Sequence, residues 1–413
     1  MVYFDKELQT KIRSEFYHLD SDPVYGKRLF FDNAGGALRL KKCVEAKSFL
    51  EEYPDCPERI HNRARELKYI VEDGTKDILE TIFGAKTGAL ITELTASQTM
   101  FHIVEMILEN TKGTNAVVSS LEHPSAFDAV KYYCEKEGKE LRVVAPNART
   151  GFIEADDVAT LVDKNTALVS VMSASNLTGA VMDIEAIVKK VRSLNPDVYV
   201  ISDAVQHAPH GLIDVENTGL DGVNFAPYKF FGVRGCGFAY VSERVAKLPH
   251  RKLIEKPKSV FELGTSTPGN FLATKELINY VVSLGAEFRE GDNRRALFAE
   301  GMSKINSYKK MLLERLVTGL EAIKGVKVMF DTSNLKNRDL IIPITLDNKS
   351  CEEAVKKYED LGVIVCDRLN TSMYAKRILD ALGISSCIRV SPLHCHSAAD
   401  IDEFLDITER ISI

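Results

Sequence analysis

Short apolar runs alternate with helix-like segments between about residues 85 and 245, and this alternation constrains the fold more than any other feature of the sequence. The runs are almost continuously apolar, as strands are in a parallel sheet that helices cover on both faces. In the segments between them, apolar residues recur at three- and four-residue spacing, as on one face of a helix. The pattern therefore predicts an α/β fold with a mostly parallel sheet. The expected strands are 116–120, 141–146, 167–175, 198–204, 222–226 and 236–242, and the expected helices include 97–110, 126–138 and 183–195.

The chain after about residue 290 follows a different pattern. A long helix-like stretch over 294–323 precedes shorter strand-like and helix-like segments that do not alternate regularly. This predicts a second, smaller α+β domain that the long helix joins to the first. We expect the large domain to span 29–270 and the small domain to comprise 1–28 and 271–413. The elements expected in the small domain are strands at 340–346, 363–367 and 387–394 and helices at 351–362 and 398–411.

Composition and charge exclude several classes of protein. The 413 residues carry a net charge of −6 with no basic stripe, so a nucleic-acid-binding protein, which must neutralise phosphates, is not expected. The N-terminus has no apolar leader, and no window approaches the roughly 18 apolar residues of a membrane span, so we expect a cytoplasmic protein without membrane contact. The eight cysteines include no C-x-x-C pair and no zinc-type spacing with histidine. We therefore expect neither a disulfide framework nor a metal site.

Polar side chains follow the ends of four expected strands. His123 follows the strand at 116–120, Asn176 follows 167–175, Asp203 and Gln206 follow 198–204, and Lys229 follows 222–226. Polar strand ends are common in α/β proteins, but ligands of such sheets bind outside the carboxyl ends of the strands. Four strand ends with distinct functional groups therefore predict a ligand site.

Lys229 lies in the apolar stretch NFAPYKFFGVRGCGF (224–238), which permits two interpretations. A lysine in such surroundings usually buries its stem and extends its ammonium group to water. Alternatively, burial of the amine lowers its pKa, so that it can attack a carbonyl and form a Schiff base. This stretch alone leaves both interpretations open and favours the first.

The other strand-end residues match what a Schiff base of pyridoxal 5′-phosphate (PLP) with Lys229 requires. The ring nitrogen of PLP needs an acid as partner, and Asp203 at the end of a buried strand is suitable, with a helix cap as the less favoured alternative. Asn176 and Gln206 can donate to the phenolic oxygen of the cofactor. His123 can stack on the cofactor ring.

The phosphate of such a cofactor would need backbone amides at a helix N-terminus. The segment TASQ (95–98) offers them, because Ala96 and Ser97 open a helix-like segment directly after the strand-like ALIT (89–92).

In their order and spacing, these residues resemble the motifs of the class V aminotransferase family of fold-type I PLP-dependent enzymes. The resemblance is greatest to the branch of cysteine desulfurase-like and selenocysteine lyase-like proteins, and it covers roughly residues 28–412. It implies the fold-type I architecture, PLP held by Lys229, an amino-acid substrate and a homodimer. The motifs are FFDNAGGA (30–37), TASQ (95–98), EHPS (122–125), SASNLTG (173–179), DAVQHAPH (203–210), YKFFG (228–232), FELGTSTP (261–268) and IRVSPLHCHSAADID (388–402).

The resemblance assigns roles to four further residues. Arg389 would bind the substrate carboxylate, for which the fork of a guanidinium group is suited, and Asn33 would lie close to the substrate. Thr265 would reach the phosphate site of the partner subunit. Tyr228 stands where the family has a histidine, and its hydroxyl would replace a phosphate donor that is lost because Ala226 stands in place of a serine or threonine.

One departure from the family bears on the reaction. Cysteine desulfurases carry a nucleophilic cysteine on a loop before the carboxylate-binding arginine, at a position that corresponds to Tyr374. No cysteine lies between residues 367 and 386, and Cys366 and Cys387 flank this stretch. The sequence therefore predicts a C–S lyase that acts by β-elimination on a cysteine-like amino acid. An aminotransferase and an amino-acid epimerase remain alternatives, and a non-catalytic PLP-fold binding protein is the least supported.

A nicotinamide-dependent Rossmann enzyme is not expected. The glycine-rich run GVRGCG (232–237) precedes an expected strand, whereas a pyrophosphate-binding loop must lead into a helix.

Overall fold

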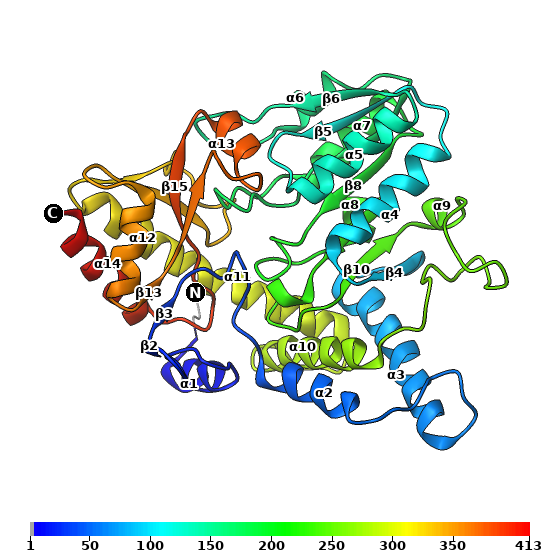
Figure 1. Ribbon diagram of the computed structural model, residues 1–413, viewed down its shortest axis with the longest axis horizontal. Coiled ribbons are helices and arrows are strands. Elements are labelled where there is room, and N and C mark those ends of the chain that lie inside the picture. Colours follow the sequence, from blue (N-terminus) through cyan, green and yellow to red (C-terminus); the bar gives the residue numbers. More distant parts are fainter. Residues whose placement is uncertain (1–3) are drawn as a thin grey trace.

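The computed structural model of the protein describes residues 4–413, in which two main β-sheets have helices packed around them (Figure 1). The larger sheet has seven strands in the order β4-β10-β9-β8-β7-β5-β6. Every strand predicted between residues 116 and 242 belongs to this sheet. Its strands are β4 (Ala89–Glu93), β5 (Asn115–Ser119), β6 (Glu140–Val144), β7 (Thr166–Ser170), β8 (Tyr199–Asp203), β9 (Gly222–Phe225) and β10 (Gly237–Val241).

The strands from β5 to β9 run parallel to one another, whereas β10 is antiparallel to both of its neighbours, β9 and β4. The predicted mostly parallel sheet is confirmed, with an antiparallel edge. The order of strands reverses at β5, because β6 lies on one side of it and β7 on the other. The carboxyl ends of strands beside such a reversal are where α/β sheets bind ligands.

Helices cover both faces of the larger sheet, which explains why its strands are apolar throughout. Val117 and Val200 pack in a core cluster with residues of α7, α10 and α11. Their neighbours Val118 and Ile201, which point to the opposite face, pack in a second cluster with residues of α4 and α5. The helices around this sheet are α2 (Lys41–Glu51), α3 (Asn62–Asp77), α4 (Ala96–Glu109), α5 (Pro124–Lys136), α7 (Ile184–Leu194), α10 (Pro268–Ala286) and α11 (Arg294–Ala322).

The smaller sheet has four antiparallel strands in the order β11-β12-β15-β14. The expected strand at 363–367 is divided between two sheets. Its first part, β13, pairs in parallel with β3, whereas its last residues begin β14, which pairs with β15 in the smaller sheet. In the part of the chain that is described, no helix has both the length and the hydropathy needed to cross a membrane. The elements of this region are β3 (Leu29–Phe30), β11 (Val326–Val328), β12 (Ile342–Leu346), α12 (Cys351–Asp360), β13 (Val363–Ile364), β14 (Cys366–Leu369), α13 (Lys376–Leu382), β15 (Ser386–Val390) and α14 (Ala398–Ser412).

The pairing of β3 with β13 brings the N-terminal segment beside the smaller sheet. A further parallel bridge joins Asp32 to Ser391, directly after β15. Residues 29–33 of the expected large domain therefore contact the expected small domain closely. The division of the chain at residue 270 remains a prediction, and residues 1–3 of the expected segment 1–28 lie outside the described residues.

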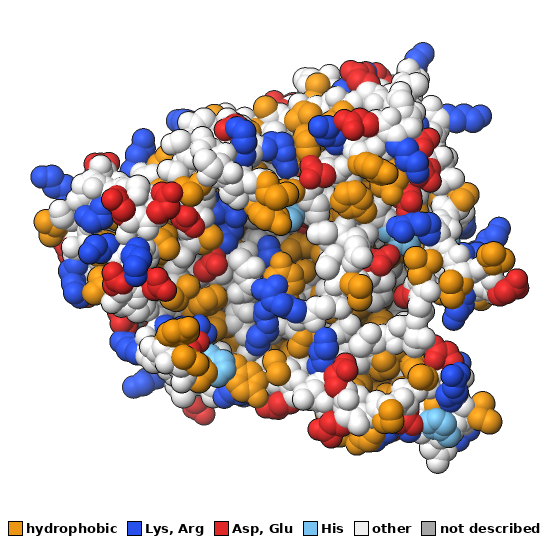
Figure 2. Space-filling view, viewed as in Figure 1, with side chains coloured by type: hydrophobic (Ala, Val, Ile, Leu, Met, Phe, Trp, Pro, Cys, Tyr) orange, Lys and Arg blue, Asp and Glu red, His pale blue; other side chains and the backbone are white. Residues whose placement is uncertain are grey.

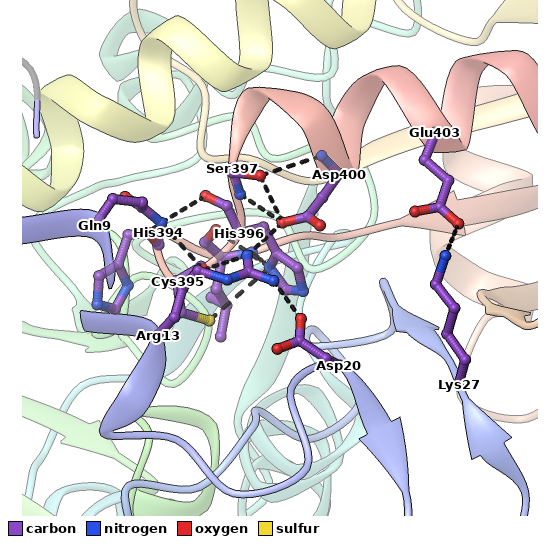
Figure 3. A network of polar contacts seen from close by, with 11 residues as sticks. Gln9, Arg13, Asp20, Lys27, His394, Cys395, His396, Ser397, Asp400 and Glu403 are labelled. Carbon is purple, nitrogen blue, oxygen red and sulfur yellow. Dashed lines mark hydrogen bonds and ion pairs between the residues drawn. The ribbon is translucent and has the colours of Figure 1, made fainter. Parts of the chain in front are cut away.

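Helix α1 (Lys6–Ser14) is fixed to the segment before α14 by a network of polar contacts (Figure 3). Gln9 Nε2 and Arg13 Nη1 both donate to the carbonyl oxygen of Cys395, each at 3.2 Å. Arg13 also pairs with Asp20 and, at 2.5 Å, with Asp400. Farther along the chain, Lys27 pairs with Glu403 at 2.7 Å. The N-terminal segment thus packs against elements of the expected small domain.

Replacing Arg13 with glutamine is expected to lower the free energy of unfolding by about 1.5–3 kcal/mol, the usual contribution of hydrogen bonds to charged groups. The loss is large because Asp400 is only 16% exposed and would lose its ionic partner. Lys11→Gln on the same helix is the control, since the pair of Lys11 with Glu287 is mostly exposed and should contribute less than about 1 kcal/mol. Chemical denaturation of both variants measures the difference. Equal effects of the two substitutions would contradict the role given to Arg13.

Candidate active site

A cavity lies at the carboxyl ends of β7, β8 and β9, beside the N-termini of α4 and α5. In the view of Figure 2, the surface is hollowed near its centre, and basic side chains lie within the hollow. The cavity brings together every residue of the predicted cofactor set except Thr265. The residues of that set that line it are Ala96, Ser97, His123, Asn176, Asp203, Gln206, Tyr228 and Lys229.

Lys229 ends a short 3-10 turn (Pro227–Lys229) that follows β9. The aromatic residues after it, Phe230 and Phe231, are at most 1% exposed and pack in the core, while the amine of Lys229 faces the cavity. Lys229 Nζ donates to Gln206 Oε1 at 3.3 Å. Buried aromatic residues before and after Lys229, Phe225 and Phe230 among them, therefore anchor the backbone. The head group of the lysine remains available to a ligand.

The turn that carries Lys229 is held in a strained conformation. Phe231 has a φ of 60°, in the left-handed region that bulky residues avoid, at a usual cost of about 1–3 kcal/mol. Hydrogen bonds from a distant segment, residues 37–40, hold the turn. Ala37 N donates to Tyr228 O at 3.2 Å, and Leu40 N donates to Phe231 O at 2.8 Å. These contacts fix the direction in which the side chain of Lys229 projects from the backbone.

The surroundings of Lys229 lower the pKa of its amine to about 8. Burial is the largest cause, and the positive charge of Arg389 adds to it, while Asp203 acts in the opposite direction. At pH 7 about a tenth of the amine is then neutral and nucleophilic, far more than of an ordinary lysine.

The lowered pKa of Lys229 predicts a shifted pH profile for its chemical modification. Only the neutral amine reacts, so its reactivity should rise with pH and reach half of its maximum near a pH of about 8. An ordinary lysine, with a pKa of about 10.4, still reacts slowly there. Acylation at several pH values, followed by peptide mass spectrometry, records Lys229 and the exposed lysines in the same sample. Identical profiles would contradict the description of the site.

Asp203 and Asn176 present acceptors that the protein satisfies only in part. Asp203, at the end of β8, is 7% exposed, its Oδ1 accepts from Val205 N at 2.9 Å, and burial raises the pKa of its carboxyl group. Asn176 is 6% exposed, and its buried Oδ1 has no hydrogen-bond partner among residues 4–413. Buried polar atoms without partners are unusual, so these two groups are suited to bind a polar ligand.

His123 forms the N-cap of α5 and lies on another side of the cavity. Its Nδ1 accepts from Ser125 N at 3.2 Å and hydrogen-bonds with Ser125 Oγ at 2.7 Å. Burial, with a smaller contribution from the charge of Lys229, lowers the pKa of His123 to about 3. The ring is therefore neutral at physiological pH and is suited to stacking.

Arg389 and Asn33, which the resemblance places at the substrate, are not among the residues that line the cavity. Arg389 on β15 is 3% exposed, with Nη2 at 2.8 Å from Asp32 Oδ1 and Nη1 donating to Asn176 O at 3.2 Å. Asn33 donates to the carbonyl oxygens of Phe30 and Ser391 and accepts from Leu38 N. The amide of Asn33 holds the segment after β3, so direct contact with a substrate would require it to give up one of these bonds.

Thr265 does not line the cavity. It is exposed in the segment before α10, and its predicted contact is with a partner subunit. That contact stays a prediction.

Several residues of the site were not in the predicted set. Arg234 and Ser125 line the cavity, and the guanidinium group of Arg234 lies 4.3 Å from the centre of the Tyr228 ring. Asp32 is the ionic partner of Arg389. Arg234 stands in the glycine-rich run after Lys229, which was the available signal, whereas nothing local in the sequence predicts the pairing of Asp32 with Arg389.

Comparisons with known proteins bear on the family and the fold of the chain. The model of the family "Aminotransferase class-V" matches residues 29–404. A probable cysteine desulfurase of Borreliella burgdorferi is 23% identical over 447 aligned positions, covering 97% of each chain. The cysteine desulfurase IscS of Dictyoglomus turgidum is 30% identical over 218 positions, which cover 52% of this chain and 54% of that protein.

Solved structures show the same fold. The apo structure of a cysteine desulfurase from Thermococcus onnurineus NA1 matches with a TM-score of 0.81 at 20% identity, covering 100% of this chain and 99% of that one. The cysteine desulfurase CsdA from Escherichia coli matches with a TM-score of 0.80 at 16% identity, covering 99% and 98%. These matches confirm the α/β fold and the mostly parallel sheet predicted from the sequence.

Proposed function

The chain belongs to the class V aminotransferase family, whose members depend on PLP, and from this we propose that it is a PLP-dependent enzyme acting on an α-amino acid at the cavity around Lys229. The observation that carries this proposal is the meeting of Lys229, Asp203 and Asn176 at one cavity. Asp203 ends β8, whereas Asn176 and Lys229 follow β7 and β9. Each of the three side chains has hydrogen-bonding capacity that the protein does not use.

The residues of the cavity fit PLP. A cationic ring nitrogen would stabilise the buried carboxylate of Asp203, and a phenolic hydroxyl would donate to Asn176 Oδ1, which has no partner among the described residues. The neutral ring of His123 offers a flat surface.

The phosphate would bind at the start of α4. The first N–H groups of a helix have no partner within it, and Thr95 Oγ1 caps only that of Gln98, at 3.2 Å. The amides of Ala96 and Ser97 are thus left for an anion, at the positive end of the helix dipole. Gly237 lets β10 pass close to this turn, because a Cβ there would lie 2.2 Å from Ala96 N.

When bound, PLP supplies an electron sink for bonds at the α-carbon of an amine substrate. Lys229 would hold the cofactor and, once the substrate amine has displaced it, would take up and return the α-proton. A pKa of about 8 suits this work near neutral pH. Arg389 would bind the α-carboxylate, since its buried Nε has no partner among the described residues.

Loss of sulfur by β-elimination is the reaction that we favour. Tyr374 occupies the place where a desulfurase would have its nucleophilic cysteine, and a phenol cannot take up sulfur as a persulfide. Burial raises the pKa of the Cys366 thiol, and it raises the pKa of Cys387 to about 12. Neither cysteine is a ready thiolate, so neither is suited to the missing role. Several relatives are nevertheless named cysteine desulfurases, which supports a sulfur-containing substrate.

Product analysis of the PLP-loaded enzyme with L-cysteine tests this function. Elimination converts cysteine and water into sulfide, pyruvate and ammonia in equal amounts, with no oxidant or reductant. Formation of alanine with thiol-releasable sulfur would instead identify a desulfurase, and in that case loss of activity in Cys366→Ser would identify the acceptor. Turnover without sulfur release would favour the aminotransferase or the epimerase, and no turnover of any amino acid would contradict the proposal.

A further inference from the structure

Arg368 on β14 shares one face of the smaller sheet with Arg389. In the antiparallel pairing of β14 with β15, Cys366 lies opposite Arg389 and Arg368 lies opposite Cys387. Alternate residues of a strand point to the same face, so these four side chains lie together. Arg368 and Arg389 are diagonal neighbours, a position at which Cα atoms are roughly 7–8 Å apart.

The charge of Arg368 is not balanced by the protein. Arg389 pairs with Asp32, but no carboxylate pairs with Arg368 among residues 4–413. Its Nη2 donates to the carbonyl oxygen of Tyr374 at 2.6 Å, and its buried Nε has no partner. Burial and the nearby charge of Arg389 both lower the pKa of Arg368. An uncompensated, partly buried guanidinium group is destabilising and is usually retained for a ligand.

Arg368 lies beside the cavity that holds Lys229. The ring of Tyr374, whose carbonyl group it binds, stacks on the ring of His123 with centroids 6.0 Å apart and planes at 28°. His123 lines the cavity, and Arg389 contacts the backbone of Asn176, which lines it too. The two arginines therefore approach the cavity from the same side.

We propose that the amino-acid substrate carries a second anionic group on its side chain, bound by Arg368 while Arg389 binds the α-carboxylate. This inference rests on the function proposed above and narrows its substrate class. Because the two guanidinium groups extend from diagonal positions on one face of the sheet, they can contact two anionic groups of the same small amino acid. A carboxylate, a sulfinate or a phosphate at that position shares the required chemistry, and of these the sulfinate of a cysteine-like substrate also contains the sulfur that the favoured elimination releases.

Calorimetric titration of the PLP-loaded protein with matched amino acids tests the proposal. Aspartate and asparagine, and glutamate and glutamine, differ within each pair chiefly in charge. Phosphoserine is compared with serine and cysteine sulfinate with cysteine, which lack the anionic group. We expect the anionic member of at least one pair to bind 10- to 100-fold more tightly, as about 1.5–3 kcal/mol for a charged hydrogen bond implies. The pair with the largest ratio identifies the anion.

Substitution of Arg368 locates the preference. Arg368→Met should reduce the ratio to about 1 and leave the affinity for alanine unchanged, whereas Arg368→Lys, which keeps the charge, should retain much of the ratio. Arg377→Met is the matched control, because Arg377 is a neighbouring basic residue that already donates to Ser120 O at 2.7 Å and lies 3.9 Å from the Phe127 ring.

Three results would overturn the inference: equal binding within every pair, a preference that survives in Arg368→Met, or an equal loss of alanine and aspartate binding in that variant. The last would show that both arginines bind the α-carboxylate. A second titration, of the protein without PLP, separates this inference from the proposed function, because it records amino-acid binding that does not depend on the cofactor. A protein that never takes up PLP but prefers acidic amino acids would refute the function alone.

Discussion

Replacement of Lys229 with alanine is expected to lower turnover by about 10²–10⁴-fold, the usual contribution of a positioned general base. Among the described residues that line the cavity, the amine of Lys229 is the only group suited both to hold an aldehyde cofactor and to move a proton at the α-carbon. Its neighbours in the core, Phe230 and Phe231, are unchanged by the substitution, so the fold should persist. Turnover of cysteine by the PLP-loaded variant, with circular dichroism to monitor folding, is the measurement.

A second buried lysine provides the control for Lys229→Ala. Lys309 on α11 is 2% exposed, its Nζ donates to Pro209 O at 2.7 Å, and burial lowers its pKa to about 7. It does not line the cavity. Lys309→Met should therefore leave turnover within a few-fold of the wild type. A loss of the same size in both variants would show that a buried lysine in general, rather than Lys229 in particular, supports activity.

Asp203→Asn is expected to reduce turnover by about 10²–10³-fold, as the removal of one preorganised electrostatic partner does in other active sites. The substitution keeps the size of the side chain and the bond that Oδ1 accepts from Val205 N, but removes the charge that would hold a proton on the cofactor ring. The measurement is kcat for cysteine in the PLP-loaded variant, with cofactor content determined separately.

Glu122→Gln is the matched control for Asp203→Asn. Glu122 is a fully buried acid close to Asp203, and burial raises its pKa to about 8. It is therefore mostly protonated at pH 7, and an amide should replace it with little effect on turnover. If Glu122→Gln were as damaging as Asp203→Asn, the special role of Asp203 would be wrong.

Much of the larger sheet and of the cavity could be predicted, because the relevant signals are local. An apolar run predicts a buried strand wherever it stands, and a polar residue at its end is expected at the edge of the sheet. The carboxyl ends of parallel strands lie at one edge, so Asn176, Asp203 and Lys229 meet at the cavity as predicted, although they are far apart in the sequence.

The rest depends on contacts between distant segments that no local pattern encodes. The apolar run at 363–367 gives no sign that β13 turns away to pair with β3, and that pairing is what brings Asp32 to Arg389. The resemblance predicts that Asn33 lies close to the substrate, but the bonds of its amide to the backbone of Phe30, Ser391 and Leu38 join distant segments and have no local signal. The alignment of Arg368 with Arg389 follows from the register of β14 on β15, which the sequence does not specify.

The most direct test of the central claim is to locate the lysine that binds the cofactor. The protein is incubated with PLP, reduced with borohydride and digested, and the modified peptide is identified by mass spectrometry. We predict that the peptide containing Lys229 carries the cofactor stoichiometrically, with the exposed lysines unmodified. Modification of exposed lysines alone, or a second site occupied as fully as Lys229, would contradict the account.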